Sequence, residues 1–158
     1  MILQAVVLFC PPAQAKTGES PVKFHGTLTI VDCTVNGNKD QTVDFGDAVG
    51  VHRIDGKRYS QPVPFIINCV VPDKGNIPPL TLTLSGIATT FDKAAVTTTV
   101  DGLGIELQRD GAPQELMKPI TVDYAHPPAI TAVPVLEPGR ELKAQPFKGG
   151  VRLIVEVV

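Results

Sequence analysis

The sequence predicts an all-β fold, an antiparallel β-sandwich formed by a single domain. Short stretches in which apolar and polar residues alternate recur between turn signals, the pattern of strands with one buried face. Few stretches keep a helical period, and 15 prolines and 14 glycines are spread through the 158 residues. A chain of this length holds one ordinary hydrophobic core, and we expect no second domain.

Alternation is clearest in four stretches. We expect strands at residues 22–24, 27–30, 42–45 and 80–84. Pro62 and Pro64 have no backbone N–H to donate to a central ladder. They therefore place the start of the strand that ends at Cys69 on a sheet edge or at a bulge.

Asn-Gly and Asp-Gly pairs mark the turns, because both residues of such a pair tolerate the left-handed backbone that tight turns require. Two of these pairs predict β-hairpins. Asp55-Gly56 would join residues 51–54 to residues 57–60, and Asp110-Gly111 would join residues 104–109 to the segment after Pro113.

The first fifteen residues have the pattern of an export signal. Residues 2–10 are apolar but for Gln4, two prolines follow, and the small residues Ala13 and Ala15 stand where a signal peptidase cleaves. The apolar run is about half of the roughly 18 residues that a membrane-spanning helix needs. We therefore expect residues 1–15 to be a signal peptide rather than a membrane helix or a buried strand.

Two cysteines, Cys33 and Cys69, remain once the signal peptide is removed. An isolated pair usually forms a disulfide in an oxidising compartment. The bridge would close a loop of about 36 residues, which the loop-entropy model associates with roughly 4 kcal/mol of stabilisation. The alternative is two free, buried thiols in a cytosolic protein, which the export signal disfavours.

The segment at residues 149–158 is the most apolar of the predicted strands. Its side chains at Val151, Leu153, Val155 and Val157 share one face. No further sequence follows that would supply a neighbouring strand, and an uncovered apolar edge is an aggregation hazard. We expect something to cover this edge.

No catalytic, metal or nucleic-acid site is predicted. His25, His52 and His126 lack metal-ligand spacing, and Asp44 and Asp47 lie at turn boundaries, where aspartate serves the backbone. No nucleophile elbow or phosphate-binding glycine loop is present. The net charge is −2 and the basic residues are scattered, which excludes a phosphate-binding surface. We expect neither an enzyme nor a cofactor.

Nearly all of the mature chain resembles the pilins of the chaperone–usher pathway. The resemblance rests on the order and spacing of several motifs rather than on any one of them. They are Phe24-His25-Gly26, Asp32-Cys33-Thr34-Val35-Asn36, Val43-Asp44-Phe45-Gly46, Phe65-Ile66-Ile67-Asn68-Cys69, Leu80-Thr81-Leu82-Thr83-Leu84-Ser85-Gly86, Gly102-Leu103-Gly104-Ile105-Glu106-Leu107 and Phe147.

The resemblance implies an incomplete immunoglobulin-like β-sandwich that lacks its final strand and is completed by donor-strand exchange. A periplasmic chaperone would fill the groove first, and the N-terminal extension of another pilin subunit would replace it at an outer-membrane usher. Residues 16–26 would be the donor extension and residues 27–158 the pilin domain. The protein would pass through the periplasm to a fimbrium on the cell surface.

The resemblance also gives roles to residues at both ends of the chain. Val22 and Phe24 would point into a neighbour's groove, with Gly26 in phase with them. The edge from Val151 to Val157 would border the acceptor groove. The alternative is that residues 22–30 form the first strand of the chain's own sandwich.

The predicted function is that of a structural subunit of an adhesive fimbria. The alternative is a secreted ligand- or sugar-binding sandwich, such as an adhesin domain, but tryptophan is absent and aromatic residues make up only 5% of the chain. Pilins tend to carry a glycine and a tyrosine where this chain has Gln145 and Val157. These departures and the short extension favour a minor, linker or terminating subunit.

Overall fold

The computed structural model describes residues 18–26, 28, 30–71 and 77–158, so the predicted signal peptide lies outside the described residues. Within that part of the chain all regular structure is β-strand apart from two single-turn 3₁₀ helices. The strands are β1 (Asp32–Val35), β2 (Gln61–Pro62), β3 (Ile67–Val70), β4 (Leu80–Ser85), β5 (Ala95–Thr97), β6 (Leu103–Arg109), β7 (Ala112–Pro113), β8 (Ile120–Val122), β9 (Ile130–Leu136) and β10 (Arg152–Val157). The 3₁₀ helices are η1 (Asn36–Asn38) and η2 (Val51–Arg53).

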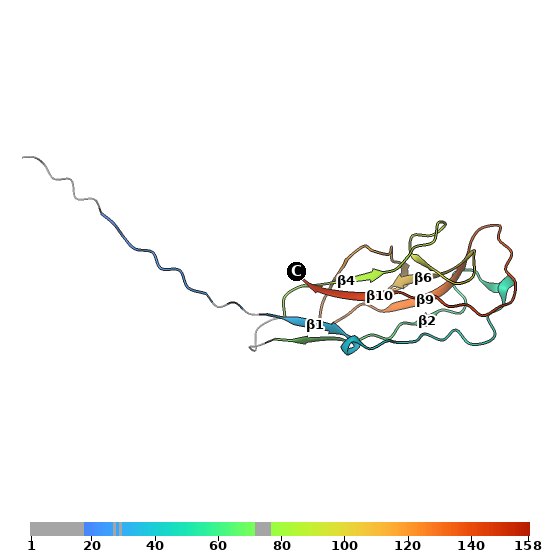
Figure 1. The fold of residues 1–158 in the computed structure, drawn as a ribbon, viewed down its shortest axis with the longest axis horizontal. Coiled ribbons are helices and arrows are strands. Elements are labelled where there is room, and N and C mark those ends of the chain that lie inside the picture. The colour runs from blue at the N-terminus through green and yellow to red at the C-terminus, as the bar shows by residue number, and fades with distance from the viewer. Residues whose placement is uncertain (1–17, 27, 29, 72–76) are drawn as a thin grey trace, which may run out of the picture.

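The strands form three antiparallel sheets (Figure 1). A five-stranded sheet has the order β2-β9-β6-β5, with β7 paired to β6, and a three-stranded sheet has the order β10-β4-β8. A separate two-stranded sheet pairs β1 with β3. One core cluster joins side chains of β4 to side chains of β5, β6 and β9, so the two larger sheets pack face to face. The predicted antiparallel sandwich is confirmed.

Strand β4 illustrates how the sequence forms this core. Leu80, Leu82 and Leu84 have no exposed surface, and the threonines between them face the other way and are half-buried. This is the period-2 pattern that the sequence predicted for residues 80–84. Burial of each leucine side chain contributes about 1.5–3 kcal/mol to folding.

The core has two clusters of buried side chains. The first is built from Leu84, Val96, Ile105, Leu107, Leu116, Ile130 and Ala132. The second is built from Ile67, Leu80, Leu82 and Val122. The side chain of Leu153 on β10 packs against both clusters, so β10 borders the whole length of the core.

One of the two predicted hairpins forms, with residues 112–113 rather than the segment after Pro113 as its second strand, and the other is wrong. Asp110 and Gly111 have φ angles of 51° and 82° and join β6 to β7. At Asp55-Gly56 the chain instead forms η2 and a local turn, in which Asp55 Oδ1 accepts hydrogen bonds from the N–H groups of Lys57 (3.0 Å) and Arg58 (2.8 Å). These short-range bonds replace a strand ladder.

Three of the predicted strands are not matched by strands among the described residues. Residues 42–45 are extended but have no ladder partner, although Val43 and Phe45 are half-buried. Residues 22–24 lie outside any strand, as do Leu28 and Ile30, the two described residues of the 27–30 stretch. Pro62 ends β2, an edge strand of the five-stranded sheet, whereas the strand that contains Cys69 is β3 and begins only at Ile67, so the two prolines do not belong to that strand as the sequence had predicted.

Candidate functional site

An open groove with a volume of about 1780 Å³ runs along the sandwich. One wall consists of β1 and the segment that follows it as far as Asp47, and the other consists of residues 142–155, which include most of β10. Apolar side chains of the five-stranded sheet also line the groove, namely Val96, Leu103, Ile105, Leu107 and Ala132. The groove therefore gives access to the first core cluster between two strand edges.

The backbone of β10 presents unpaired hydrogen-bonding groups to this groove. Val158 N–H donates to Pro79 O at 2.9 Å, which sets the phase of the ladder between β10 and β4. Because pairing in an antiparallel ladder alternates along the strand, the even-numbered residues of β10 bond to β4. The N–H and C=O groups of the odd-numbered residues 151–157 point to the opposite edge, where the described residues provide no partner strand.

The backbone of β1 does the same from the other wall. Asn36 N–H donates to Ile66 O at 2.8 Å, so the even-numbered residues of β1 bond to β3. The N–H and C=O groups of Cys33 and Val35 are therefore directed away from β3, toward the groove. The edges of β1 and β10 therefore face each other across the groove, and each presents backbone N–H and C=O groups that have no ladder partner among the described residues.

The predicted disulfide is present and holds one of these walls. Cys33 on β1 and Cys69 on β3 are bonded, and their Cα atoms are 4.1 Å apart. The two residues are register partners at a close, non-hydrogen-bonded position of the ladder. Both half-buried cysteines pack against the second core cluster.

Three of the four predicted acceptor-edge residues line the groove. Val151, Leu153 and Val155 are half-buried and appear among the residues that form it. Val157 is 40% exposed and lies beyond the lining, opposite Leu80 at the end of β10. The phase predicted for this strand, with odd-numbered side chains toward the core, agrees with their packing on the two core clusters.

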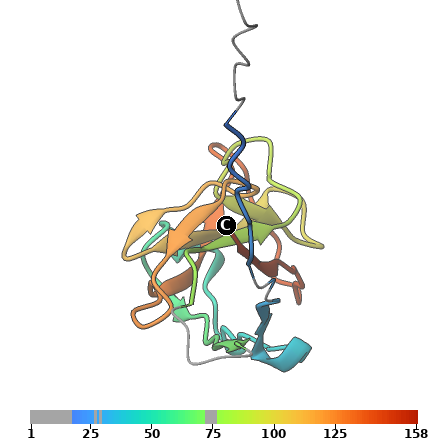
Figure 2. The ribbon, with the colours of Figure 1, turned by 90° about the vertical axis from the view of Figure 1, so that its left-hand side faces the viewer.

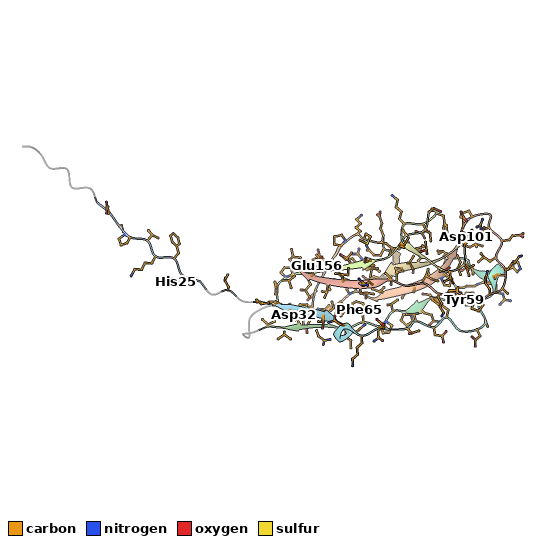
Figure 3. The ribbon with its side chains drawn as sticks, in the orientation of Figure 1. His25, Asp32, Tyr59, Phe65, Asp101 and Glu156 are labelled. Atoms are coloured by element: carbon orange, nitrogen blue, oxygen red, sulfur yellow. A yellow bond between two sulfur atoms is a disulfide. The ribbon has the colours of Figure 1, made fainter. Side chains whose placement is uncertain are left out.

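The predicted donor residues lie on a segment that projects away from the sandwich (Figures 1 and 3). Val22 is 72% exposed, Phe24 is 92% exposed and Gly26 is exposed as well. Leu28 and Ile30 continue the same alternation and are 101% and 81% exposed. The sequence predicts a strand of the pilin domain at residues 27–30, whereas β1 begins at Asp32.

An aromatic contact joins the two walls. The rings of Phe45 and Phe147 have centroids 5.8 Å apart and planes inclined by 46°. Both rings line the groove and pack against the first core cluster. Both residues belong to sequence motifs noted above, but no local signal in the sequence indicates that they meet.

The ionisable groups with shifted pKa values lie outside the groove. Burial raises the pKa of Glu106, and nearby Asp92 adds to this, while Gln108 opposes it with a 2.7 Å hydrogen bond. Backbone N–H groups of Arg58 and Lys57 lower the pKa of Asp55. The side chain of His126, followed by the N–H of Ala125, lowers the pKa of Asp123.

The described residues contain no group of three or more side chains suited to hold a metal ion, and no helix long and apolar enough to cross a bilayer. A second, smaller hollow of about 440 Å³ is polar and lies beside Arg109, Asp123 and His126. The apolar groove is therefore the principal candidate site.

The fold is shared with pilus subunits of known structure. The chain superposes on the P pilus rod subunit PapA with a TM-score of 0.59 at 18% identity, covering 87% of this chain and 100% of PapA. It superposes on the P pilus adaptor subunit PapF with a TM-score of 0.55 at 20% identity, covering 80% and 95% of the two chains. A subunit of a chaperone–usher pilus gives a TM-score of 0.55 at 15% identity, covering 93% and 100%. The fold is the immunoglobulin-like fold of pilins.

The sequence comparison gives the family. The chain is 35% identical over 127 residues to the fimbrial-like protein YfcQ of Escherichia coli strain K12, and the match covers 78% of each chain. No family model matches the sequence. The chain belongs to the fimbrial-like proteins, which makes it a structural protein and not an enzyme.

Proposed function

We propose that the chain is a structural subunit of a cell-surface fimbria that joins its neighbours by non-covalent strand exchange. Its exposed N-terminal segment would fill the groove of one neighbour, and its own groove would take the corresponding segment of another. The observation that carries this proposal is the pairing, in one chain, of an apolar groove between two unpaired strand edges with an exposed segment of alternating apolar residues.

The lengths of the groove edge and of the N-terminal segment agree. The free groups of residues 151–157 extend over about 20 Å at roughly 3.4 Å per residue. The alternating segment at residues 22–30 is long enough to pair along this whole edge. Inserted between β10 and β1, it would bond to both and join the two-stranded and three-stranded sheets into one. The sandwich would then have two complete layers.

The proposed donor therefore extends further along the chain than residue 26. Val22, Phe24, Leu28 and Ile30 fall on one face of an extended strand, with Gly26 between them. The alternative, in which these residues form the domain's own first strand, is disfavoured by the exposure of Leu28 and Ile30.

The direction of insertion follows from where the segment leaves the sandwich. In Figure 1 the segment departs from the end at which β10 finishes and β1 starts. In a fibre of subunits repeated head to tail, the segment would enter a neighbour's groove from the opposite end. It would thus run antiparallel to β10 and parallel to β1.

The route to the surface is part of the proposal. A signal peptide at residues 1–15 would direct export, and the Cys33–Cys69 bridge fits an oxidising compartment such as the periplasm. There a pilus chaperone would cover the groove until an outer-membrane usher allowed a subunit to replace it. PapA and PapF, which share this fold, are described as P pilus subunits.

The proposal is tested by adding a synthetic peptide of residues 16–30 to the chain, expressed with and without a pilus chaperone. We expect the chain to be unstable alone and to form a complex with the peptide that survives denaturant. A peptide with Val22→Asp and Phe24→Asp should not bind, because two charges would enter the apolar groove.

The matched control is a peptide with Lys23→Asp and His25→Asp. It carries the same two new carboxylates on the opposite face of the strand and should still bind. A chain that is monomeric, stable alone and indifferent to every peptide would refute strand exchange and favour the ligand-binding sandwich.

A further inference from the structure

The sheet formed by β1 and β3 stands apart from the rest of the sandwich. In the end-on view of Figure 2 it lies below the other two sheets. Among the described residues, its strands form ladders only with each other. It is seated on the second core cluster through Ile67, which is 6% exposed, and through the two half-buried cysteines.

The position of this small sheet sets the width of the groove. Cα atoms of β1 approach Cα atoms of β10 to within 8 Å, although no ladder joins the two strands. Two strands that flank a third in a sheet are about 9.5 Å apart. The groove at β1 is therefore narrower than an inserted strand requires, by at least about 1.5 Å.

β1 and β3 are also fastened to each other along their length. The disulfide links Cys33 to Cys69, and Asn36 adds two hydrogen bonds to Ile66. Its N–H donates to Ile66 O, and Asn36 Oδ1 accepts from Ile66 N–H, both at 2.8 Å. Displacing β1 alone would break these bonds, whereas displacing both strands together keeps them.

We propose that β1 and β3 form a flap, a two-stranded unit held together by the disulfide and by the hydrogen bonds of Asn36 to Ile66, and that this flap moves as one body away from β10 when a strand enters the groove. This inference rests on the proposed function, in which the groove accepts a strand, and adds that β1 and β3 move together when it does. The flap would widen the groove by at least about 1.5 Å while keeping its own register. The apolar contacts of Ile67 and the cysteines are non-directional, so they shift more readily than a ladder breaks.

Crystal structures of the chain with and without the peptide of residues 16–30 test this directly. The expected result is a Cα–Cα separation between β1 and β10 that rises from within 8 Å to about 9.5 Å, with the pairing of Cys33 and Cys69 unchanged. A bound peptide with the separation still within 8 Å would overturn the flap alone. A peptide that does not bind would overturn the acceptor function and the flap together.

A second measurement tests whether the Cys33–Cys69 disulfide makes β1 and β3 move together. We expect peptide binding to change the amide hydrogen exchange of both β1 and β3 in the oxidised chain. In the variant Cys33→Ala/Cys69→Ala the response of β3 should fall by at least half, while that of β1 remains. An undiminished response of β3 in the variant would show that the disulfide does not transmit the motion, and a response of β1 alone in the oxidised chain would contradict the flap.

Discussion

At the scale of single residues, alternation identifies the side chains that matter most to stability. Leu80, Leu82 and Leu84 were placed on one face from the sequence, and all three are fully buried. The turn at Asp110-Gly111 was equally readable, because it needs only the two residues themselves. The turn at Asp55 was predicted wrongly. The sequence does not tell whether the aspartate side chain accepts hydrogen bonds from the N–H groups of its own loop or leaves them free to pair with another strand.

Replacing Leu82 by alanine should destabilise the fold by about 2–5 kcal/mol, since the residue has no exposed surface and leaves a cavity. Urea unfolding of the peptide-complemented chain measures this. The control is Thr81→Ala, at a half-buried position on the other face, which should cost less than about 1 kcal/mol. Equal losses in the two variants would contradict the assignment of the buried face.

Glu106 should make stability depend on pH. Its pKa is raised above the usual value of 4.5, chiefly by burial, so the folded state favours the protonated form. That contribution is fully present below pH 4.5 and is lost as the pH rises through the folded-state pKa. Glu106→Gln keeps an acceptor for Gln108 and removes the charge.

The variant Glu106→Gln should therefore be more stable than the parent at pH 7, by less than about 1 kcal/mol given partial exposure to solvent. The two proteins should converge toward pH 4. Thermal unfolding across pH 4–8 measures the difference. A parent protein that gains stability relative to the variant as the pH rises would contradict the raised pKa.

At the scale of elements, the phase of β10 assigns each backbone group to one side. The N–H of Ile154 faces β4, and the N–H of Val155 faces the groove. Proline lacks this hydrogen atom, so the same substitution at adjacent positions should have different consequences.

Val155→Pro should spare the ladder with β4 and weaken binding of the donor peptide at least tenfold, because the inserted strand loses one bond and meets the proline ring. Ile154→Pro should instead unfold the chain or lower its stability by about 3 kcal/mol or more. Peptide titration and denaturant unfolding of both variants provide the comparison. Equal effects on folding and binding at the two sites would refute the phase assigned to β10.

The sequence was least informative about which strands pair and about what each element lies beside. Residues 42–45 alternate as a strand does, yet they only line the groove, because a ladder requires a partner that no local pattern specifies. The side chains of Ile105, Leu107 and Ala132 were readable as buried but not as the lining of an open groove. For Leu28 and Ile30, alternation was visible, but whether it serves this domain or a neighbour depends on where β1 starts.

At the scale of the whole molecule, the chain offers an exposed segment of alternating residues at one end and a groove along its length. The segment has no ladder, and the open groove leaves apolar surface in contact with water. A fibre in which each subunit completes the next would resolve both deficiencies. Strand exchange is the central claim.

Residue-resolved amide hydrogen exchange, before and after addition of the peptide of residues 16–30, tests this claim most directly. Strand exchange predicts new protection at Cys33 and Val35 on β1 and at Leu153 and Val155 on β10, with little change at the even-numbered residues already paired to β3 and β4. Absence of new protection at these odd-numbered residues, in the presence of saturating peptide, would contradict the claim.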